Sequence, residues 1–330
     1  MALTQAQKTL IEKAKATGGG ELGTGLSDSA CTYIIATIIR DLNLIEKFPE
    51  LNDDFPDFFE QRDPGLLEIS GLNFYHITEK LIEIVPDADT YFACLAALLK
   101  SRLKYTRILA YQPVPTLDQV GPRTLLQYGQ MSTKALAGFL LWRKWLFDID
   151  NRAGQETGYL FEPIIAHAIG GIPVSAGKSP VRRSKDKKKG RQVDCIRNNL
   201  AYEIKIRVTV AASGQGRWRE ELDFPTDCKE SGFKPVLIVL DPTPNPKLDE
   251  LTHAFKNQEG EVYIGDTAWN HLEEVAGETM SIFLEKYVKS PISEVLRSAP
   301  EELPEIAFKM NNTAFSVTIE GEHTEFKRKI

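Results

Sequence analysis

Cysteine and histidine are scarce in this chain, and their spacing excludes several kinds of site. The four cysteines stand at positions 31, 94, 195 and 228 without a Cys-x-x-Cys pair, which argues against a zinc site and against a disulfide framework. The five histidines show no ligand spacing. Long apolar runs and a basic-then-apolar signal pattern are also missing, so we expect a cytoplasmic protein with no membrane partner.

A nucleotide-binding loop is not indicated either. The tripeptide Gly177-Lys178-Ser179 has part of the phosphate-binding pattern, but the earlier glycine that the pattern requires would fall at Ile172. No strand is predicted before it. We therefore expect no nucleotide cofactor.

The composition is that of an ordinary globular protein with an uneven charge. The 330 residues are 42% apolar and 26% charged, enough for two domains or one elaborated domain. The net charge of −6 argues against bulk binding of polyanions, yet residues 178–191 alone carry +7. This run is either a solvated loop or a loop that contacts phosphates, because local fields steer a phosphate backbone. Its basic residues are Lys178, Arg182, Arg183, Lys185, Lys187, Lys188, Lys189 and Arg191.

Hydrophobic periodicity divides the chain near residue 150. Before it, helices are predicted over 4–17, 27–44, 87–109, 123–130 and 132–149. After it, a helix over 153–169 precedes a hairpin, a buried strand over 236–240, a helix over 248–256, a strand over 262–264 and a helix from 268. The chain is also predicted to be helical over 276–300, with a last strand over 315–319. The expected architecture is an α/β domain over 151–290, with an all-α region before it and a C-terminal extension over 291–330.

The most informative segment is the hairpin over 192–205. Asn198-Asn199 between two alternating runs predicts a two-residue turn, because asparagine tolerates positive φ. Counting outward from this turn places Asp194 directly opposite Glu203, and Lys205 lies on the same face. Two facing carboxylates repel each other unless a cation lies between them. The hairpin therefore predicts a metal site.

Phosphodiester hydrolysis needs these groups. Asp194 and Glu203 would hold Mg²⁺ through oxygen ligands, with the Ile204 carbonyl as a third. Lys205 would lie beside the attacking water, deprotonate or orient it, and stabilise developing charge. A second Glu-x-Lys, at 325–327, has no aspartate within the fifty residues before it, and we set it aside.

This arrangement resembles the PD-(D/E)xK nuclease superfamily, in particular type II restriction endonucleases, with Val193 in place of the usual proline. The resemblance covers about 153–275 and implies a mixed sheet flanked by helices. It assigns the catalytic positions to Asp194, Glu203 and Lys205, and a helical glutamate to either Glu156 or Glu162. Residues 205–219 also resemble the ApaLI-type restriction enzymes.

The segment that follows the hairpin carries side chains able to read base edges. Arginine and glutamine bond guanine and adenine bidentately in the major groove. Residues 213–220 therefore form either a DNA contact, which we favour, or a flexible loop with an aromatic anchor. The candidate contacts are Gln215, Arg217, Trp218 and Arg219.

The resemblance implies a Mg²⁺-dependent enzyme that hydrolyses both strands of a short, specific, palindromic site in double-stranded DNA. A palindromic site favours a homodimer, in which residues 1–150 would supply dimer contacts or DNA clamping. The alternatives are a repair or junction-resolving nuclease of the same superfamily and a non-catalytic DNA-binding protein on a nuclease fold.

Overall fold

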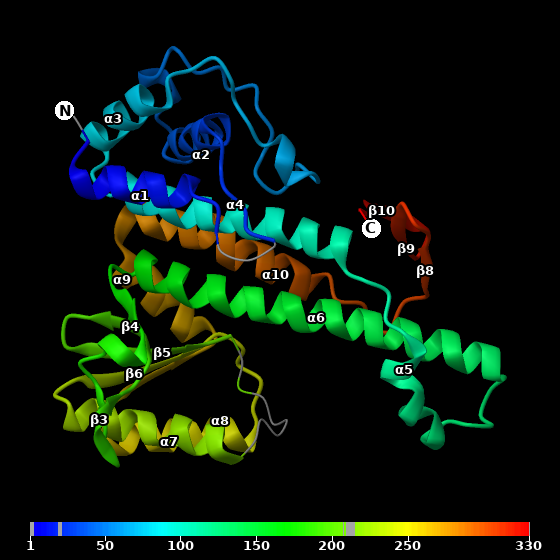
Figure 1. Cartoon of the computed structure of the whole chain (residues 1–330). Coiled ribbons are helices and arrows are strands. Elements are labelled where there is room, and N and C mark those ends of the chain that lie inside the picture. Colours follow the sequence, from blue (N-terminus) through cyan, green and yellow to red (C-terminus); the bar gives the residue numbers. More distant parts are fainter. Residues whose placement is uncertain (1–2, 19–21, 207, 209–214, 330) are drawn as a thin grey trace.

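A five-stranded mixed sheet organises the protein. The computed structural model describes residues 3–18, 22–206, 208 and 215–329 (Figure 1). The strand order is β1-β4-β5-β6-β7, in which β1, β4 and β5 are antiparallel and β5, β6 and β7 are parallel. The strands are β1 (Ile172–Val174), β4 (Val193–Arg197), β5 (Leu200–Lys205), β6 (Lys234–Val239) and β7 (Glu261–Ile264).

Helices cover both faces of this sheet. Helices α6 (Thr133–Ala168) and α9 (Asp266–Leu284) pack on one face, and α7 (Gln215–Glu230) and α8 (Pro246–Asn257) pack on the other (Figure 1). Tyr202 and Ile204 of β5 join the core beneath α6 and α9, whereas Ala201 joins the core beneath α7 and α8. The predicted mixed sheet flanked by helices is therefore confirmed.

The N-terminal region is helical, as the sequence predicted. It is continuous with the sheet's own core, because apolar residues of α2, α4, α6, α9 and β5 form one buried cluster. No helix in the described ranges is long and apolar enough to cross a membrane. The helices are α1 (Gln5–Lys15), α2 (Asp28–Asp41), α3 (Phe74–Ile84), α4 (Ala88–Tyr111) and α5 (Leu117–Val120), followed by a 3₁₀ turn (Gly121–Leu126).

Two helices were predicted where the structure has one. Helix α6 runs unbroken through Asp150, so the division placed there falls inside a helix. A glycine at position 154 lowers helix stability by only about 1 kcal/mol relative to alanine. The packing of α6 along α4 and the sheet stabilises the helix enough to accommodate both Gly154 and Pro163. The helix ends as predicted, with Gly170 at φ +71°. A Cβ at Gly171 would lie 2.2 Å from the Cys195 sulfur, so this turn packs closely on β4.

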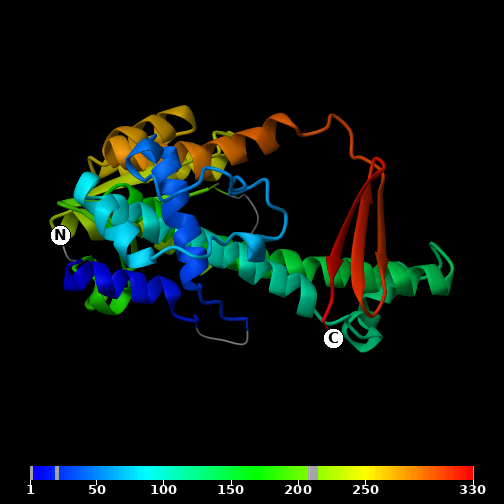
Figure 2. The same ribbon diagram turned by 90° about the horizontal axis from the view of Figure 1, so that it is seen from above.

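Several elements were not predicted. They include α3, α7, and a ribbon of β2 (Arg182–Arg183) and β3 (Asp186–Gly190). The helical prediction over 276–300 is confirmed, because the α9 segment continues through a π turn (Glu285–Lys289) into α10 (Ser290–Arg297). The C-terminal extension is a second, three-stranded antiparallel sheet of β8 (Ile306–Met310), β9 (Ala314–Ile319) and β10 (Glu322–Lys327). Of these strands, β9 was predicted over 315–319, and β8 and β10 were not. It crosses the outer half of α6 (Figure 2), where Phe315 packs on Trp145 at 4.6 Å between ring centroids.

A buried carboxylate ties the N-terminal helices to the end of the α9 segment. Asp41 has a side chain only 1% exposed. It accepts hydrogen bonds from the Tyr91 hydroxyl at 2.8 Å and the Tyr287 hydroxyl at 2.6 Å, and the Lys286 ammonium lies 2.6 Å away. Because α2, α4 and the π turn all meet at this group, removing it leaves buried donors unpaired.

We predict that Asp41→Ala lowers the free energy of unfolding by about 2–4 kcal/mol, because two buried hydroxyls and an ammonium lose their acceptor. The matched control is Asp57→Ala, whose exposed ion pair with Arg40 should cost less than about 1 kcal/mol. Urea unfolding followed by circular dichroism measures both. Equal costs for the two variants would contradict the structural role of Asp41.

Candidate active site

The predicted hairpin is confirmed in register and in its turn. Arg197 pairs with Leu200 and Cys195 with Tyr202, and Asn198 has φ of +54°. Continuing this register by one residue brings Asp194 opposite Glu203. The Lys205 ammonium lies 3.1 Å from Glu203 Oε1, which agrees with the predicted shared face of these two residues.

Asp194 is a buried carboxylate near the start of β4. Its side-chain oxygen accepts a hydrogen bond from the Ile204 amide at 2.9 Å, in place of a backbone partner. Because the N–H and C=O of a strand residue point toward the same neighbouring strand, the Ile204 carbonyl is directed to the same side. Burial, with the charges of Glu203 and Glu162, raises the pKa of Asp194 well above its ordinary value.

Lys205 closes β5 with its ammonium between two carboxylates. The nitrogen lies 3.1 Å from Glu203 Oε1 and 3.4 Å from Glu221 Oε2 of α7. Burial lowers the pKa of Lys205, but Glu203 and Glu221 outweigh this effect and leave the pKa above its ordinary value. The ammonium form therefore dominates at neutral pH.

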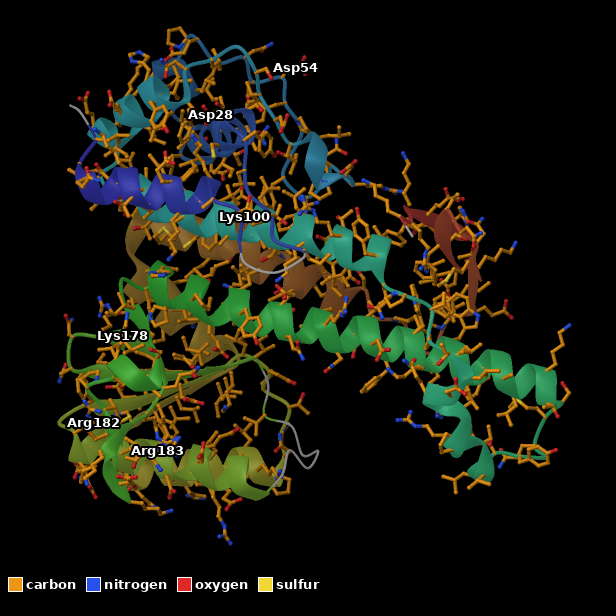
Figure 3. The ribbon with its side chains drawn as sticks, in the orientation of Figure 1. Asp28, Asp54, Lys100, Lys178, Arg182 and Arg183 are labelled. Atoms are coloured by element: carbon orange, nitrogen blue, oxygen red, sulfur yellow. The ribbon has the colours of Figure 1, made fainter. Side chains whose placement is uncertain are left out.

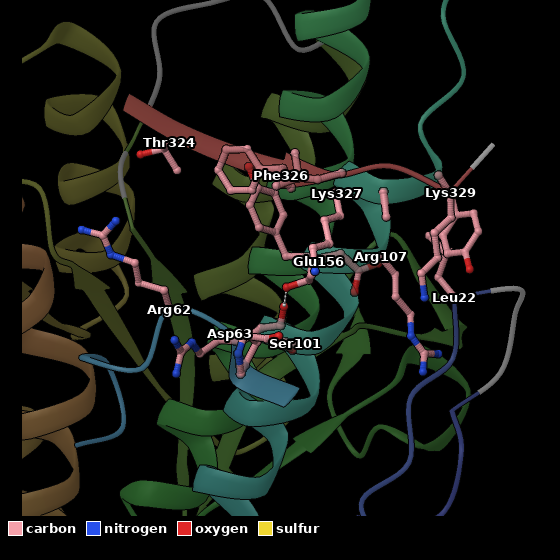
Figure 4. A pocket seen from close by; sticks show the side chains of 18 of the residues that line it. Leu22, Arg62, Asp63, Ser101, Arg107, Glu156, Thr324, Phe326, Lys327 and Lys329 are labelled. Carbon is pink, nitrogen blue, oxygen red and sulfur yellow. Dashed lines mark hydrogen bonds between the residues drawn. The ribbon is translucent and has the colours of Figure 1, made fainter. Parts of the chain in front are cut away.

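The structure separates the two candidate glutamates of α6. Glu162 lies near the hairpin, and burial together with the Glu203 charge raises its pKa. Glu156 instead pairs with Lys104 at 2.7 Å and lines a groove of about 1420 Å³ beside Phe326 and Lys327 of β10 (Figure 4). Glu156 and Glu162 are six residues apart on α6, so their positions differ by about 9 Å along the helix axis and by a third of a turn around it. Only Glu162 is brought to Asp194 and Glu203.

The oxygen ligands of the hairpin fit a magnesium ion that also binds water and phosphate better than they fit a metal ion bound only by protein side chains. Within the described ranges, no three His, Cys, Asp or Glu side chains form a group that could hold a metal. Magnesium is usually bound by one or two carboxylates, with waters and substrate phosphates completing its octahedron. The pair Asp194 and Glu203, with the adjacent Ile204 carbonyl, matches that pattern.

The basic run was predicted as a loop, and this is wrong: it folds as the β2–β3 ribbon against α7. Arg183 pairs with Glu220 at 2.7 Å. The other ion pairs of the run are Lys185 with Asp223, Lys187 with Glu230, Arg191 with Asp227, and Lys189 with Asp186. Acidic residues of α7 thus neutralise much of the field that the sequence predicted.

Three basic side chains of the run have no acidic partner among the described residues, so their charge could contact phosphate. For Lys178, Arg182 and Lys188 no ion pair is found in the part of the chain that the structure describes. Lys178 and Arg182 lie with Arg183 around the ribbon (Figure 3). Lys178, Arg182 and Lys188 are therefore the strongest remaining candidates of the run for contacts to phosphate.

For the segment after the hairpin, the alternative of a flexible loop is wrong from Gln215 onward, and the contact with DNA stays a prediction. Residues 213 and 214 lie outside the described residues, and from Gln215 onward the chain is helix α7; the side chains of Gln215 and Arg217 likewise lie outside the description. The Trp218 indole donates to Glu250 of α8 at 3.0 Å, which anchors the helix. Arg219 is exposed.

Comparison with known proteins identifies the family. The family described as ApaLI-like restriction endonuclease matches residues 66–289. The chain belongs to the ApaLI-like restriction endonuclease family. The type II restriction enzyme ApaLI of Acetobacter pasteurianus is 54% identical over 215 residues, which are 63% of this chain and 57% of the relative. The chain thus spans less than two thirds of that relative's length. No solved structure matches the chain.

The ApaLI-like match extends from the 3₁₀ turn at Pro64–Leu66 to the π turn after α9. It includes the whole hairpin, Glu162 and helix α7. It leaves out the C-terminal sheet β8–β10 and helices α1 and α2. The matched part is therefore the sheet with the helices that flank it, together with α3 to α5.

We predict that Asp194→Asn stabilises the protein in EDTA at neutral pH by roughly 0.5–2 kcal/mol, because it removes a carboxylate that burial and two like charges disfavour. A raised native pKa means that the native state holds more protons than the unfolded chain, so wild-type stability is lost as pH rises through that pKa. The gain should therefore shrink as pH falls.

Thermal unfolding of both proteins across pH measures this effect. The exposed Asp249→Asn is the control and should change stability by less than about 0.5 kcal/mol. A gain that is independent of pH, or a loss at neutral pH, would show that Asp194 is not under electrostatic stress.

Proposed function

We propose that this protein is a type II restriction endonuclease that uses Mg²⁺ to hydrolyse both strands of a short, specific, palindromic site in double-stranded DNA. The observation that carries the proposal is the hairpin, in which Asp194 bonds the Ile204 amide and Lys205 lies against Glu203, in a chain of the ApaLI-like family. The named activity of the relative from Acetobacter pasteurianus supports it.

In this proposal Asp194, Glu203 and the Ile204 carbonyl hold the ion. When bound, Mg²⁺ neutralises charge on the scissile phosphate and lowers the pKa of a water. The Lys205 ammonium orients the attacking water and stabilises the charge that develops on the phosphate. Glu162 adds negative charge beside the pair, which favours binding of a cation over an empty site.

A two-fold symmetric DNA site is cut in both strands most simply by a two-fold symmetric dimer. We therefore propose a homodimer in which each protomer cuts one strand. The helical N-terminal region is the proposed source of dimer contacts or of a DNA clamp.

The first test is digestion of plasmid and phage DNA. Wild-type protein with Mg²⁺ should give discrete fragments, EDTA should abolish them, and Lys205→Ala should lower the cleavage rate by about 10²-fold or more, because it removes a charge that stabilises the transition state. Cleavage at scattered positions would favour a repair or junction-resolving nuclease. Binding without cleavage would favour a non-catalytic DNA-binding protein.

Helix α6 supplies a matched pair for this assay. Glu162→Gln should slow cleavage, whereas Glu156→Gln should leave the rate within about twofold, because Glu156 pairs with Lys104 away from the hairpin. Equal loss in both variants would remove the argument that Glu162 belongs to the site.

We further predict opposite effects on DNA affinity from two charge changes near the ribbon. Lys188→Ala should weaken binding and reduce the slope of log affinity against log salt by about 1, as expected for one lost phosphate contact. Glu230→Gln should tighten binding, because it frees Lys187 from its ion pair. Fluorescence anisotropy with a labelled duplex at several salt concentrations measures both. No change in either variant would exclude this ribbon from the DNA interface.

A further inference from the structure

Helix α7 contributes a carboxylate to the hairpin site that the sequence analysis did not include. Glu221 Oε2 lies 3.4 Å from the Lys205 nitrogen, and Glu203 Oε1 lies 3.1 Å from the same nitrogen. The Lys205 and Glu203 side chains are 17% exposed and that of Glu221 is 23% exposed. The ammonium is thus shared between two partly desolvated carboxylates from different elements.

The shared position of the ammonium matters because two cations, the Lys205 ammonium and the proposed metal ion, would bind the same Glu203 carboxylate. In the proposed function that carboxylate binds Mg²⁺, yet the Lys205 ammonium already lies against it. A divalent cation placed there would both repel the ammonium and compete with it for the same oxygens. Lys205 therefore needs another counter-ion whenever Glu203 turns to a metal.

We propose that Glu221 is the positioning residue that provides this counter-ion. It holds the Lys205 ammonium at the site while Glu203 is engaged by the metal, so that metal and lysine occupy neighbouring positions without displacing each other. This inference rests on the proposed function. It assigns Glu221 no contact with the metal.

The packing of α7 fixes Glu221 for this role. Glu221, Phe224 and Cys228 follow one another at helical spacing, and Phe224 and Cys228 are buried in the core beneath α7 and α8. The neighbouring face of the helix is bound to the ribbon through Asp227, which accepts hydrogen bonds from the Ser184 amide and from Arg191. The helix therefore presents Glu221 to Lys205 from a rigid support.

The test measures metal affinity in the absence of DNA. Free Mn²⁺ is followed by electron paramagnetic resonance during titration of the full-length protein and its variants. Glu221→Gln should weaken Mn²⁺ binding roughly threefold or more, because Lys205 then neutralises Glu203 alone. Lys205→Met should tighten Mn²⁺ binding. In the Lys205→Met background, Glu221→Gln should change the affinity by less than about twofold.

Asp223→Asn is the control for a remote loss of charge, since Asp223 belongs to the same helix but pairs with Lys185. It should weaken Mn²⁺ binding less than Glu221→Gln does. Thermal unfolding verifies that each variant is folded. Should Glu221→Gln fail to fold, Glu221→Asp retains the charge but draws it back from Lys205, and it should weaken binding in the wild-type background only.

An equal loss of affinity in the wild-type and Lys205→Met backgrounds would overturn the proposal, because Glu221 would then act on the metal directly. No loss in the wild-type background would overturn it as well. Failure of the wild-type protein to bind Mn²⁺ more tightly than Asp194→Asn is a different result. It would remove the metal site of the proposed function itself, and this inference with it.

Discussion

Repulsion between two carboxylates on one hairpin is the constraint on which the rest of the site depends. The register of β4 and β5, continued by one residue, brings Asp194 opposite Glu203, and burial together with the Glu203 charge makes the charge on Asp194 costly. The chain reduces this cost with the Ile204 amide and the Lys205 ammonium. These contacts compensate only in part, since the pKa of Asp194 stays raised. In the proposed function, a divalent cation would supply the remaining compensation.

Helix α7 connects the charges of the hairpin site to those of the β2–β3 ribbon. Its residues Glu220, Asp223, Asp227 and Glu230 lie at helical spacing on one face and pair with the basic ribbon. On an adjacent face, Glu221 reaches Lys205. The same helix therefore balances the charge of the candidate phosphate contacts and that of the candidate catalytic lysine. A movement of α7 on DNA binding would alter both sets of ion pairs together.

Short-range features of the site were predictable from the sequence, and longer-range ones were not. The turn at Asn198 and the alternation around it determine which residues face each other, because a hairpin register depends on local geometry. The choice between Glu156 and Glu162 depends on where α4 and the sheet meet α6, and no local pattern encodes that. The basic run was misjudged for the same reason, since four of its five paired residues find their partners on α7, more than thirty positions away.

One missed element could have been predicted from topology. The apolar run over 236–240 indicates a buried strand, and β6 lies parallel to β5. Parallel neighbours need a crossover connection, which is usually a helix. Helix α7 makes this connection, but its sequence is rich in acidic residues and contains Pro225. Hydrophobic periodicity alone therefore does not predict a helix there. The apolar spacing of Phe224 and Cys228, with Glu221 one turn earlier, would then have directed a glutamate toward the carboxyl end of β5. The candidate partner of Lys205 was thus encoded in the connection between two strands, and a reading of the hairpin alone could not include it.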